Sequence, residues 1–447
     1  PRADEAGEDL SAESDLMVGS TMNSDLFGGG DARLAWTPDG ERILFSAPVE
    51  GSYELFTVEP ATRRIARLTE DRHYLSRADL APLAAGRPGA ARVAAVRATG
   101  STPPDIVSLD LPAPGGRVDR RPPLRRLTDL MGEAWRGMRL VEPVARWHEV
   151  DGRRIQGWYI APQGTRRGRK APLVVEIHGG PATLYGWSMF WEWQCLAAQG
   201  VGVYACNPRG SQGYGQAFQA ANIGDWGEGP MRDVVGGVEA LIAEGLADPS
   251  RLGVTGGSYG GYLTSWIISQ TDRFRAAVTC RSVSDMISQM LSGDIGGATF
   301  GRLEYRVQPW EDPLLYLEHS PLRYAERITT PLLIQHSEKD LRTPIGQAEE
   351  LFSVLRSLRR EVRLMRVPEE THELTRSGAP FRRVENLTII LDWFRHYLVE
   401  GRRGLPPLPR RAGARSGRPP AGTPQRPSAA RSRSNQAKSS SRPRGSR

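Results

Sequence analysis

The sequence predicts an α/β protein in which a mostly parallel sheet, covered by helices on both faces, follows an all-β region. Three observations lead to this prediction. The chain has 447 residues and is 39% hydrophobic, which suffices for a large core. From about residue 141, near-continuous apolar segments alternate with amphipathic ones, a pattern typical of a parallel sheet between helices. Before that point, short segments of alternating polarity are separated by turns.

The first predicted region, residues 1–140, contains two similar groups of short strands. Within residues 34–45, apolar residues alternate with polar ones around a Pro-Asp-Gly turn that favours a hairpin. The phrase Arg-Leu-Thr followed by an acidic residue occurs at 67–70 and again at 126–129. Four-strand units at this spacing are typical of propeller blades. We therefore expect a partial β-propeller of about two blades, truncated relative to a closed propeller, and an open sheet is the alternative that the spacing leaves open.

The second predicted region, residues 141–400, contains six buried strands of a parallel sheet. The apolar segments that predict them are 172–180, 200–210, 251–258, 273–280, 331–340 and 361–370. Amphipathic runs at 231–245 and 345–360 fit helices between the strands. Functional sites of such sheets gather at the carboxyl ends of the strands. Polar residues that follow these segments are therefore candidates for chemistry.

The last 47 residues, 401–447, are rich in Pro, Ser, Gly and Arg and nearly devoid of apolar residues, which predicts a disordered tail. They hold 13 Lys and Arg and no acidic residue, so the rest of the chain carries a net charge of −5 against +8 for the whole. The basic character belongs to the tail. We expect no specific nucleic-acid binding, although non-specific phosphate contacts of the tail stay open as an alternative.

The three cysteines, Cys195, Cys206 and Cys280, have no spacing typical of a disulfide framework or a zinc site and are expected to be buried free thiols. No apolar stretch reaches 18 residues, so no membrane span is predicted. The chain begins at Pro1, so an upstream segment is expected to lie outside this sequence. Unpaired thiols without a visible signal peptide favour a cytoplasmic location.

A candidate nucleophile lies in Gly256-Gly257-Ser258-Tyr259-Gly260, which fits the pattern G-x-S-x-G after a strand and before a helix. In such a turn the serine has a strained backbone, and the residues two before and two after it approach too closely for a Cβ atom. Glycine at both positions removes that clash. The pattern predicts a nucleophile elbow with Ser258 held at the tip of a strand.

A serine hydroxyl near neutral pH needs a general base, and the base needs an orienting carboxylate. In this fold the chain order is serine, acid, histidine. Asp340 follows the segment 331–340 and His372 follows 361–370, at the carboxyl ends of two predicted strands. The predicted triad is therefore Ser258, Asp340 and His372.

Other residues compete for these roles, and one further motif supplies candidates for stabilising the oxyanion. Glu338 is an alternative acid, Glu373 is expected to be a solvated or substrate-facing charge, and His336 is expected to pack inside its strand. His319 and His396 lie in helix-like segments. The segment His178-Gly179-Gly180-Pro181 ends a strand with two glycines, so we expect the N–H groups of Gly180 and Tyr259 to form the oxyanion hole.

The segments HGGP, NPRGSQGYG, GDWG, GGSYGG, DLRTP and THE together resemble the prolyl oligopeptidase family of serine peptidases, and most closely its acylaminoacyl-peptidase branch. The resemblance covers roughly residues 20–400. It implies an α/β-hydrolase domain capped by a β-propeller that limits entry to short peptides. It also implies the triad and oxyanion residues named above, and a substrate-binding role for Arg342. Arg209 and Tyr214, and likewise Asp225 and Trp226, match segments expected to be structural.

The resulting hypothesis is a serine peptidase that cleaves short peptides, including ones N-acylated at the first residue, through an acyl-enzyme at Ser258. This chemistry requires no metal or organic cofactor. A carboxylesterase using the same triad and a dipeptidyl-peptidase-like exopeptidase are alternatives. A binding protein with a decayed hydrolase domain and a nucleic-acid-binding protein acting through the tail are weaker ones. The sequence leaves the oligomeric state open.

Overall fold

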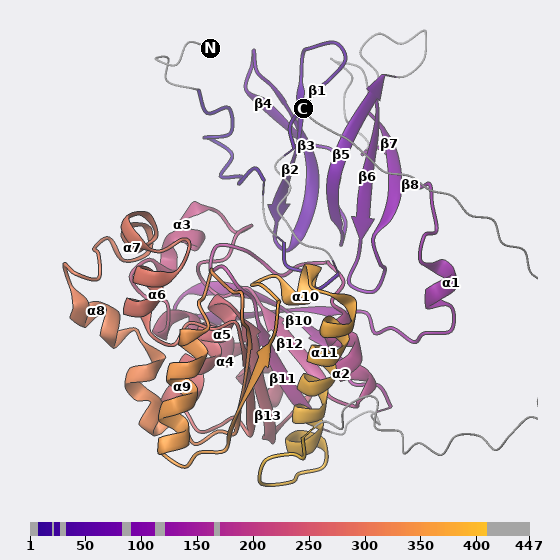
Figure 1. Cartoon of the computed structure of the whole chain (residues 1–447). Coiled ribbons are helices and arrows are strands. Elements are labelled where there is room, and N and C mark those ends of the chain that lie inside the picture. The colour runs from indigo at the N-terminus through magenta and orange to yellow at the C-terminus, as the bar shows by residue number, and fades with distance from the viewer. Residues whose placement is uncertain are drawn as a thin grey trace, which may run out of the picture. The chain divides into compact units, whose positions relative to one another are not determined.

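The computed structural model describes residues 8–19, 22–26, 33–82, 91–111, 121–164 and 170–408. The chain divides into two compact units, Pro1–Pro406 and Pro407–Arg447. The described part of the first unit holds two eight-stranded sheets (Figure 1). Most of the tail predicted to be disordered, residues 401–447, lies outside the described residues.

The first sheet consists of two four-stranded antiparallel groups. The strands are β1 (Ala35–Trp36), β2 (Ile43–Val49), β3 (Ser52–Glu59), β4 (Arg64–Arg67), β5 (Tyr74–Pro82), β6 (Ala91–Ala98), β7 (Asp105–Leu111) and β8 (Arg125–Arg126). Strands β1 to β4 pair in succession, as do β5 to β8, and one parallel pair, Tyr53 with Tyr74, joins the groups. These groups agree with the predicted repeat, and their membership of a propeller stays a prediction.

The repeated Arg-Leu-Thr phrase has the same structural role in both groups. In the first, the hydroxyl of Thr69 donates to the Glu54 carboxylate on the third strand. In the second, the hydroxyl of Thr128 donates to Asp105, also on the third strand of its group, and Arg126 pairs with the same carboxylate at 2.6 Å. Each phrase thus supplies hydrogen-bond donors to an acidic side chain on the third strand of its own group.

The second sheet contains the six predicted parallel strands and two antiparallel strands at one edge. The strands are β9 (Val144–Val150), β10 (Arg153–Ile160), β11 (Ala171–Ile177), β12 (Gly202–Cys206), β13 (Ala247–Gly257), β14 (Ala276–Cys280), β15 (Leu332–Ser337) and β16 (Val362–Val367). Their order is β16-β15-β14-β13-β11-β12-β10-β9, parallel from β16 to β12. The carboxyl ends of β13, β15 and β16 therefore lie at one edge of the sheet, where the site is expected.

Helices cover both faces of this sheet (Figure 1). Apolar residues of α4 (Glu228–Ala243), α5 (Tyr259–Gln270) and α9 (Gly346–Ser357) belong to one buried cluster with the sheet, and those of α2 (Trp191–Ala198) and α11 (Pro380–Phe394) to the other. The remaining helical segments are α1 (Gly132–Trp135), α3 (Gln216–Gln219), η1 (Ala220–Asn222), α6 (Met286–Ser292), α7 (Gly297–Tyr305), α8 (Pro313–Glu318), η2 (Pro321–Arg327), α10 (Leu374–Ser377) and η3 (Arg395–Val399). The predicted α/β arrangement is confirmed.

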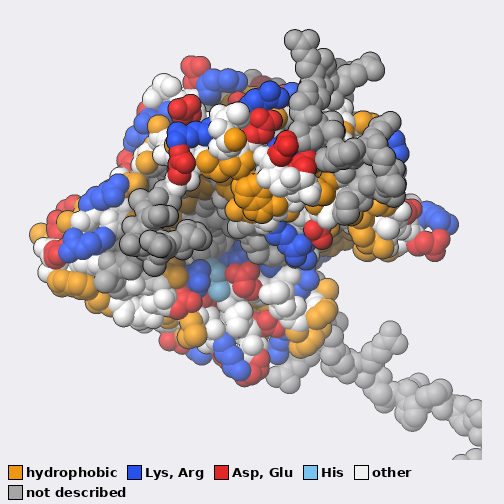
Figure 2. All heavy atoms as spheres, turned by 90° about the horizontal axis from the view of Figure 1, so that it is seen from above, with side chains coloured by type: hydrophobic (Ala, Val, Ile, Leu, Met, Phe, Trp, Pro, Cys, Tyr) orange, Lys and Arg blue, Asp and Glu red, His pale blue; other side chains and the backbone are white. Residues whose placement is uncertain are grey.

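Cysteines and surface charge agree with the composition. Cys195, Cys206 and Cys280 are free thiols, but only Cys206 and Cys280 are buried as expected, whereas Cys195 is partly exposed on α2. On the face shown in Figure 2, lysine and arginine side chains are interspersed with acidic ones. None of the helices in the described ranges is both long enough and apolar enough to cross a membrane.

Candidate active site

Ser258 lies in a strained turn between β13 and α5. Its backbone has φ 62° and ψ −124°, a conformation that costs a non-glycine residue about 1–3 kcal/mol. A Cβ atom on Gly256 would lie 2.6 Å from the carbonyl oxygen of Ile177, and one on Gly260 would clash with the same oxygen. The two glycines are therefore required because the turn packs directly against β11.

The packing of α5 holds this turn in place. The N–H of Ser258 donates to the carbonyl of Cys280 at 3.0 Å, which ties the turn to the end of β14. The hydroxyl of Tyr259 donates to the carbonyl of Trp226 at 2.9 Å, and the two rings pack edge to face. The Tyr259 side chain is thus engaged within the core, and only its backbone N–H, in the first turn of α5, is left as a candidate donor.

Asp340 and His372 meet at the same edge of the sheet. Asp340 follows β15, His372 follows β16, and the distance from His372 Nδ1 to Asp340 Oδ2 is 2.7 Å. The Asp340 side chain is fully buried, whereas 11% of the His372 side chain is exposed. The ring nitrogen that faces away from Asp340, Nε2, makes no hydrogen bond within the described residues. It is therefore available to take a proton from a nearby hydroxyl.

Hydrogen bonds keep the Asp340 carboxylate ionised. Its Oδ1 accepts the N–H groups of Arg342 and Thr343 at 3.0 and 2.9 Å, and the hydroxyl of Thr343 lies 3.1 Å from Oδ2. Burial by itself raises the pKa of Asp340, but hydrogen bonding from His372 and these donors holds it below its ordinary value. The pKa of His372 is lowered by burial, which the bond to Asp340 only partly offsets. The imidazole is therefore suited to act as a neutral base.

The third predicted member of the triad, Ser258, follows β13 at the same edge of the sheet and has no bond to the base. The Ser258 hydroxyl makes no hydrogen bond to His372 or to any other described residue. The turn of Gly179 packs against the serine, since a Cβ atom on Gly179 would lie 3.3 Å from the Cβ of Ser258. In the structure, Asp340 is hydrogen-bonded to His372, and the HGGP segment packs against Ser258.

His178 fixes the turn that contains Gly180. Its Nε2 lies 2.9 Å from the hydroxyl of Ser211, and its Nδ1 lies 2.7 Å from the carbonyl of Gly179. Burial lowers the pKa of His178 to about 4, so this imidazole is neutral. Gly180 has φ 126°, a backbone conformation that residues other than glycine rarely adopt. The HGGP segment is therefore a rigid turn whose backbone is set before any ligand binds.

The competing residues have other partners. His336 is buried in β15, with Nε2 2.7 Å from the carbonyl of Thr343, as expected for a packed strand residue. Glu338 pairs with Arg366 at 3.0 Å. His319 and His396 bond to backbone carbonyls of Leu315 and Gly404, and Glu373 pairs with Arg376.

Arg342 and the expected structural residues are also engaged. The Nε of Arg342 lies 2.5 Å from Oδ1 of Asp294, and the guanidinium is 43% exposed. Arg209 makes a buried two-point pair with Asp233 at 2.8 and 2.6 Å. Asp225 accepts two backbone N–H groups at the start of α4. The last two contacts are structural, as the sequence indicated.

Two residues beside the predicted triad were missed in the sequence. Thr343 bonds the acid, and Arg281 lies directly after β14, between the serine and the histidine segments. The position of each residue in the sequence could have indicated a place near the site, because Thr343 belongs to the segment DLRTP and Arg281 directly follows a predicted strand. Neither residue type is a usual member of a triad.

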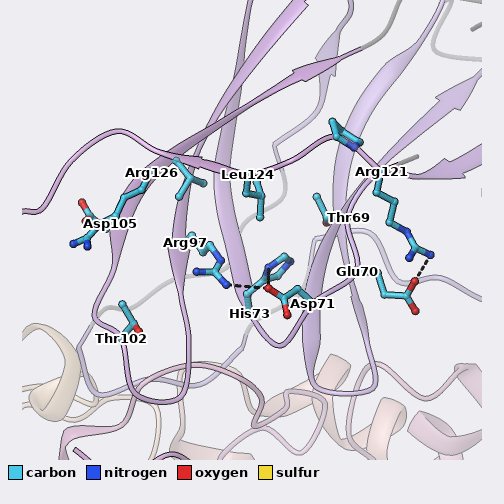
Figure 3. A pocket seen from close by; sticks show the side chains of 12 residues that line it. Thr69, Glu70, Asp71, His73, Arg97, Thr102, Asp105, Arg121, Leu124 and Arg126 are labelled. Carbon is cyan, nitrogen blue, oxygen red and sulfur yellow. Dashed lines mark hydrogen bonds and ion pairs between the residues drawn. The ribbon is translucent and has the colours of Figure 1, made fainter. Parts of the chain in front are cut away.

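A hollow of about 590 Å³ in the first sheet is unlike this site. Figure 3 shows Arg97 pointing toward Asp71 and Arg121 toward Glu70. Its charges are therefore largely matched within the sheet itself. Among the residues that the structure describes, no group of three or more His, Cys, Asp or Glu side chains is arranged to hold a metal ion.

Several known proteins are similar to this chain. Residues 187–401 match the model of the prolyl oligopeptidase family. The chain is 36% identical to the uncharacterized peptidase YuxL of Bacillus subtilis over 388 residues, 86% of this chain and 56% of that protein. It is 27% identical to the acylamino-acid-releasing enzyme of Sus scrofa over 76% of this chain and 47% of the enzyme.

A solved structure extends the likeness to the fold. Acylaminoacyl peptidase of Pyrococcus horikoshii superposes with a TM-score of 0.76 at 26% identity, covering 89% of this chain and 59% of that one. The chain thus spans somewhat over half the length of these two microbial proteins and somewhat under half that of the Sus scrofa enzyme. The resemblance predicted from the motifs is confirmed, and residues 187–401, which the family model matches, place this part of the chain in the prolyl oligopeptidase family.

Proposed function

We propose that the chain is a serine peptidase that cleaves short peptides, including N-acylated ones, through an acyl-enzyme at Ser258. The observation that carries this proposal is the 2.7 Å contact between His372 and Asp340 at the sheet edge where β13 ends in the serine turn. A carboxylate that orients an imidazole beside a strained serine is the arrangement that activates a hydroxyl for acyl transfer.

In the proposed reaction, the Oγ of Ser258 attacks the scissile carbonyl carbon while Nε2 of His372 takes the hydroxyl proton. The bond to Asp340 stabilises the imidazolium that forms. The peptide C–N bond then breaks, and His372 returns the proton to the leaving amine. Water attacks the acyl-enzyme by the same route in reverse, which frees the acid and restores the serine.

The negative charge of the tetrahedral intermediate needs donors that are oriented in advance. We assign this role to the backbone N–H groups of Gly180 and Tyr259, and losing one such donor typically costs about 3–4 kcal/mol of transition-state stabilisation. The rigidity of the HGGP turn and the position of Tyr259 at the start of α5 support this assignment. Arg342 is proposed to bind a substrate carbonyl or carboxylate while Asp294 orients its guanidinium.

Labelling with a fluorophosphonate tests the nucleophile without knowledge of the substrate. The chain should react covalently at one serine, and Ser258→Ala should abolish labelling while leaving thermal unfolding nearly unchanged. Ser265→Ala, which removes another hydroxyl of the same helix, is the matched control and should still be labelled. Labelling that persists in Ser258→Ala would contradict the assignment.

The substrate class is tested with a panel of short chromogenic compounds. We expect N-acetylated peptide anilides to be hydrolysed, and Ser258→Ala to be inactive on all of them. Preference for anilides with a free N-terminal amine would favour the dipeptidyl-peptidase alternative. Hydrolysis of p-nitrophenyl esters alone would favour a carboxylesterase and refute the peptidase proposal.

A further inference from the structure

Arg281 lies between the two halves of the proposed triad. It follows β14 directly, and its backbone has φ 41°, a left-handed conformation that is unfavourable for arginine. Such strain persists only where the surrounding structure holds it, and it gathers at functional sites.

The backbone of Arg281 is bonded to the segment that contains the acid. Its N–H donates to the carbonyl of Gln335 on β15 at 2.9 Å. Its carbonyl oxygen lies 3.0 Å from the hydroxyl of Thr343, which also lies 3.1 Å from Oδ2 of Asp340 and 3.4 Å from Nδ1 of His372. The position of Arg281 is thus coupled to that of the acid and the base.

The side chain of Arg281 contacts the segments of the other two triad members. Its Nη1 donates to the hydroxyl of Thr375 at 3.2 Å, in the short helix α10 that follows His372. Its guanidinium also packs against Gly257, since a Cβ atom there would lie 2.7 Å from the guanidinium carbon. One side chain therefore spans the serine turn and the histidine segment.

The charge of this guanidinium has no direct counter-ion. Within the described residues, no carboxylate lies within 4 Å of it, and its Nε is buried without a hydrogen bond. It lines a small cavity, about 50 Å³, together with Asp25, Glu176 and Glu192. Burial raises the pKa of Glu192 to about 7 and that of Glu176 well above its ordinary value, so neither neutralises the cation fully.

We propose that Arg281 is a positioning residue of the triad: it holds the serine turn and the histidine segment together, and its charge keeps His372 in the neutral form that accepts a proton. This inference rests on the proposed function of Ser258 and His372. Arg281 would act through the triad residues and would not itself contact the reacting atoms.

The charges around His372 set the direction of the expected effect. Asp340 favours the imidazolium, whereas Arg281 and Arg376 oppose it, and burial lowers the pKa of His372 further. Glu373 is paired with Arg376, and Nε2 of His336, whose pKa is lowered by burial, lies 3.7 Å from Oδ2 of Asp340, the oxygen that also bonds His372. Removing the charge of Arg281 should therefore raise the pKa of His372, so that reactivity is lost at a higher pH as the solution is acidified.

The test is the rate of fluorophosphonate labelling as a function of pH. The acid-limb midpoint of Arg281→Met should move upward by about 0.5–1 pH unit, as expected for loss of one nearby cation. Arg281→Gln, which keeps a donor toward Thr375, is a second neutral variant and should move in the same direction. Arg281→Lys should keep the midpoint of the wild type.

Two controls separate charge from packing. Thr375→Val removes the hydrogen-bond partner and keeps the cation, so it should lower the plateau rate severalfold without moving the midpoint. Arg251→Met removes an arginine that pairs with Asp248 at the start of β13, far along the strand from Ser258, and should change neither quantity.

The outcomes distinguish this inference from the proposed function. If the wild-type chain does not label at all, the proposed function fails and this inference fails with it. If the wild type labels but the neutral variants share its midpoint, only the role of Arg281 is overturned. Equal upward shifts in Arg281→Lys and Arg281→Met would also overturn it, because the charge would then not be the cause.

Discussion

Two sites in this chain pair a buried carboxylate with a histidine and a threonine, one in each sheet. In the first sheet, Oε2 of Glu54 lies 2.9 Å from Nε2 of His73 and accepts the hydroxyl of Thr69 at 2.5 Å. In the second, Asp340 has the same kinds of partners in His372 and Thr343. The pairing by itself therefore does not identify an active site.

The sites differ in what surrounds the second ring nitrogen. His73 has no exposed surface, and its Nδ1 is buried without a hydrogen bond. His372 is partly exposed, and the serine turn lies at its edge of the sheet. A carboxylate and histidine stabilise a fold when both are enclosed, and they can transfer protons when one nitrogen faces a nucleophile. Substitution of matched residues in the two sites tests this difference.

The largest contrast is expected from the histidines. His372→Ala should lower the fluorophosphonate labelling rate by about 10⁵-fold, because the serine loses its base, and should hardly change stability. His73→Ala should leave labelling of folded molecules unchanged and destabilise the fold by about 3 kcal/mol, because the buried Glu54 loses one of its partners and keeps only Thr69, Arg67 and the N–H of Asp71. Rate measurements and urea unfolding of both variants check this. Equal losses of labelling in the two would abolish the distinction.

Substitutions of the two carboxylates should show the same contrast with smaller effects on labelling rate and on stability. Asp340→Asn should slow labelling by about 10³–10⁴-fold, since the imidazole loses its orienting charge. Glu54→Gln should cost about 2–3 kcal/mol of stability and no activity.

The pH dependence of stability sharpens that second prediction. Burial raises the pKa of Glu54, but hydrogen bonding and charge from His73 hold it below its ordinary value of 4.5. Its stabilising contribution is therefore present above about pH 4.5 and is lost as the pH falls below that value. Unfolding free energies of wild type and Glu54→Gln should accordingly converge in acid. A constant difference from pH 7 to pH 3 would contradict this account.

The threonines should give the smallest effects. Thr343→Val removes a hydroxyl from Asp340 and should slow labelling by about tenfold, the effect of one hydrogen bond to a charged group. Thr69→Val should instead lower the unfolding free energy by about 1.5–3 kcal/mol, since the hydroxyl also accepts the N–H of Leu55. Kinetics and denaturant titration on both variants measure the two effects. Slower labelling of Thr69→Val under conditions where the variant is fully folded would refute the purely structural role of Thr69.

Local chemistry made the parallel strands and the serine turn predictable. The six strands were recognisable because strands buried on both faces are apolar throughout, and Gly256 and Gly260 because only glycine fits beside the Ile177 carbonyl. The two antiparallel strands β9 and β10 were not predicted. β9 is partly exposed, and β10, although largely buried, begins with charged and polar residues, so both sequences have a mixed pattern that does not decide between a strand and a loop.

By its order of residues alone, this chain determined the fold class, the nucleophile turn and the candidates for acid and base, since those depend on periodicity and on residue type near one strand end. Only the tertiary structure decided that Arg281 lies between Gly257 and Thr375 and that His73 is enclosed while His372 is not. The reason is physical: enclosure, electric field and contact depend on which distant segments pack together, and no local pattern contains that information.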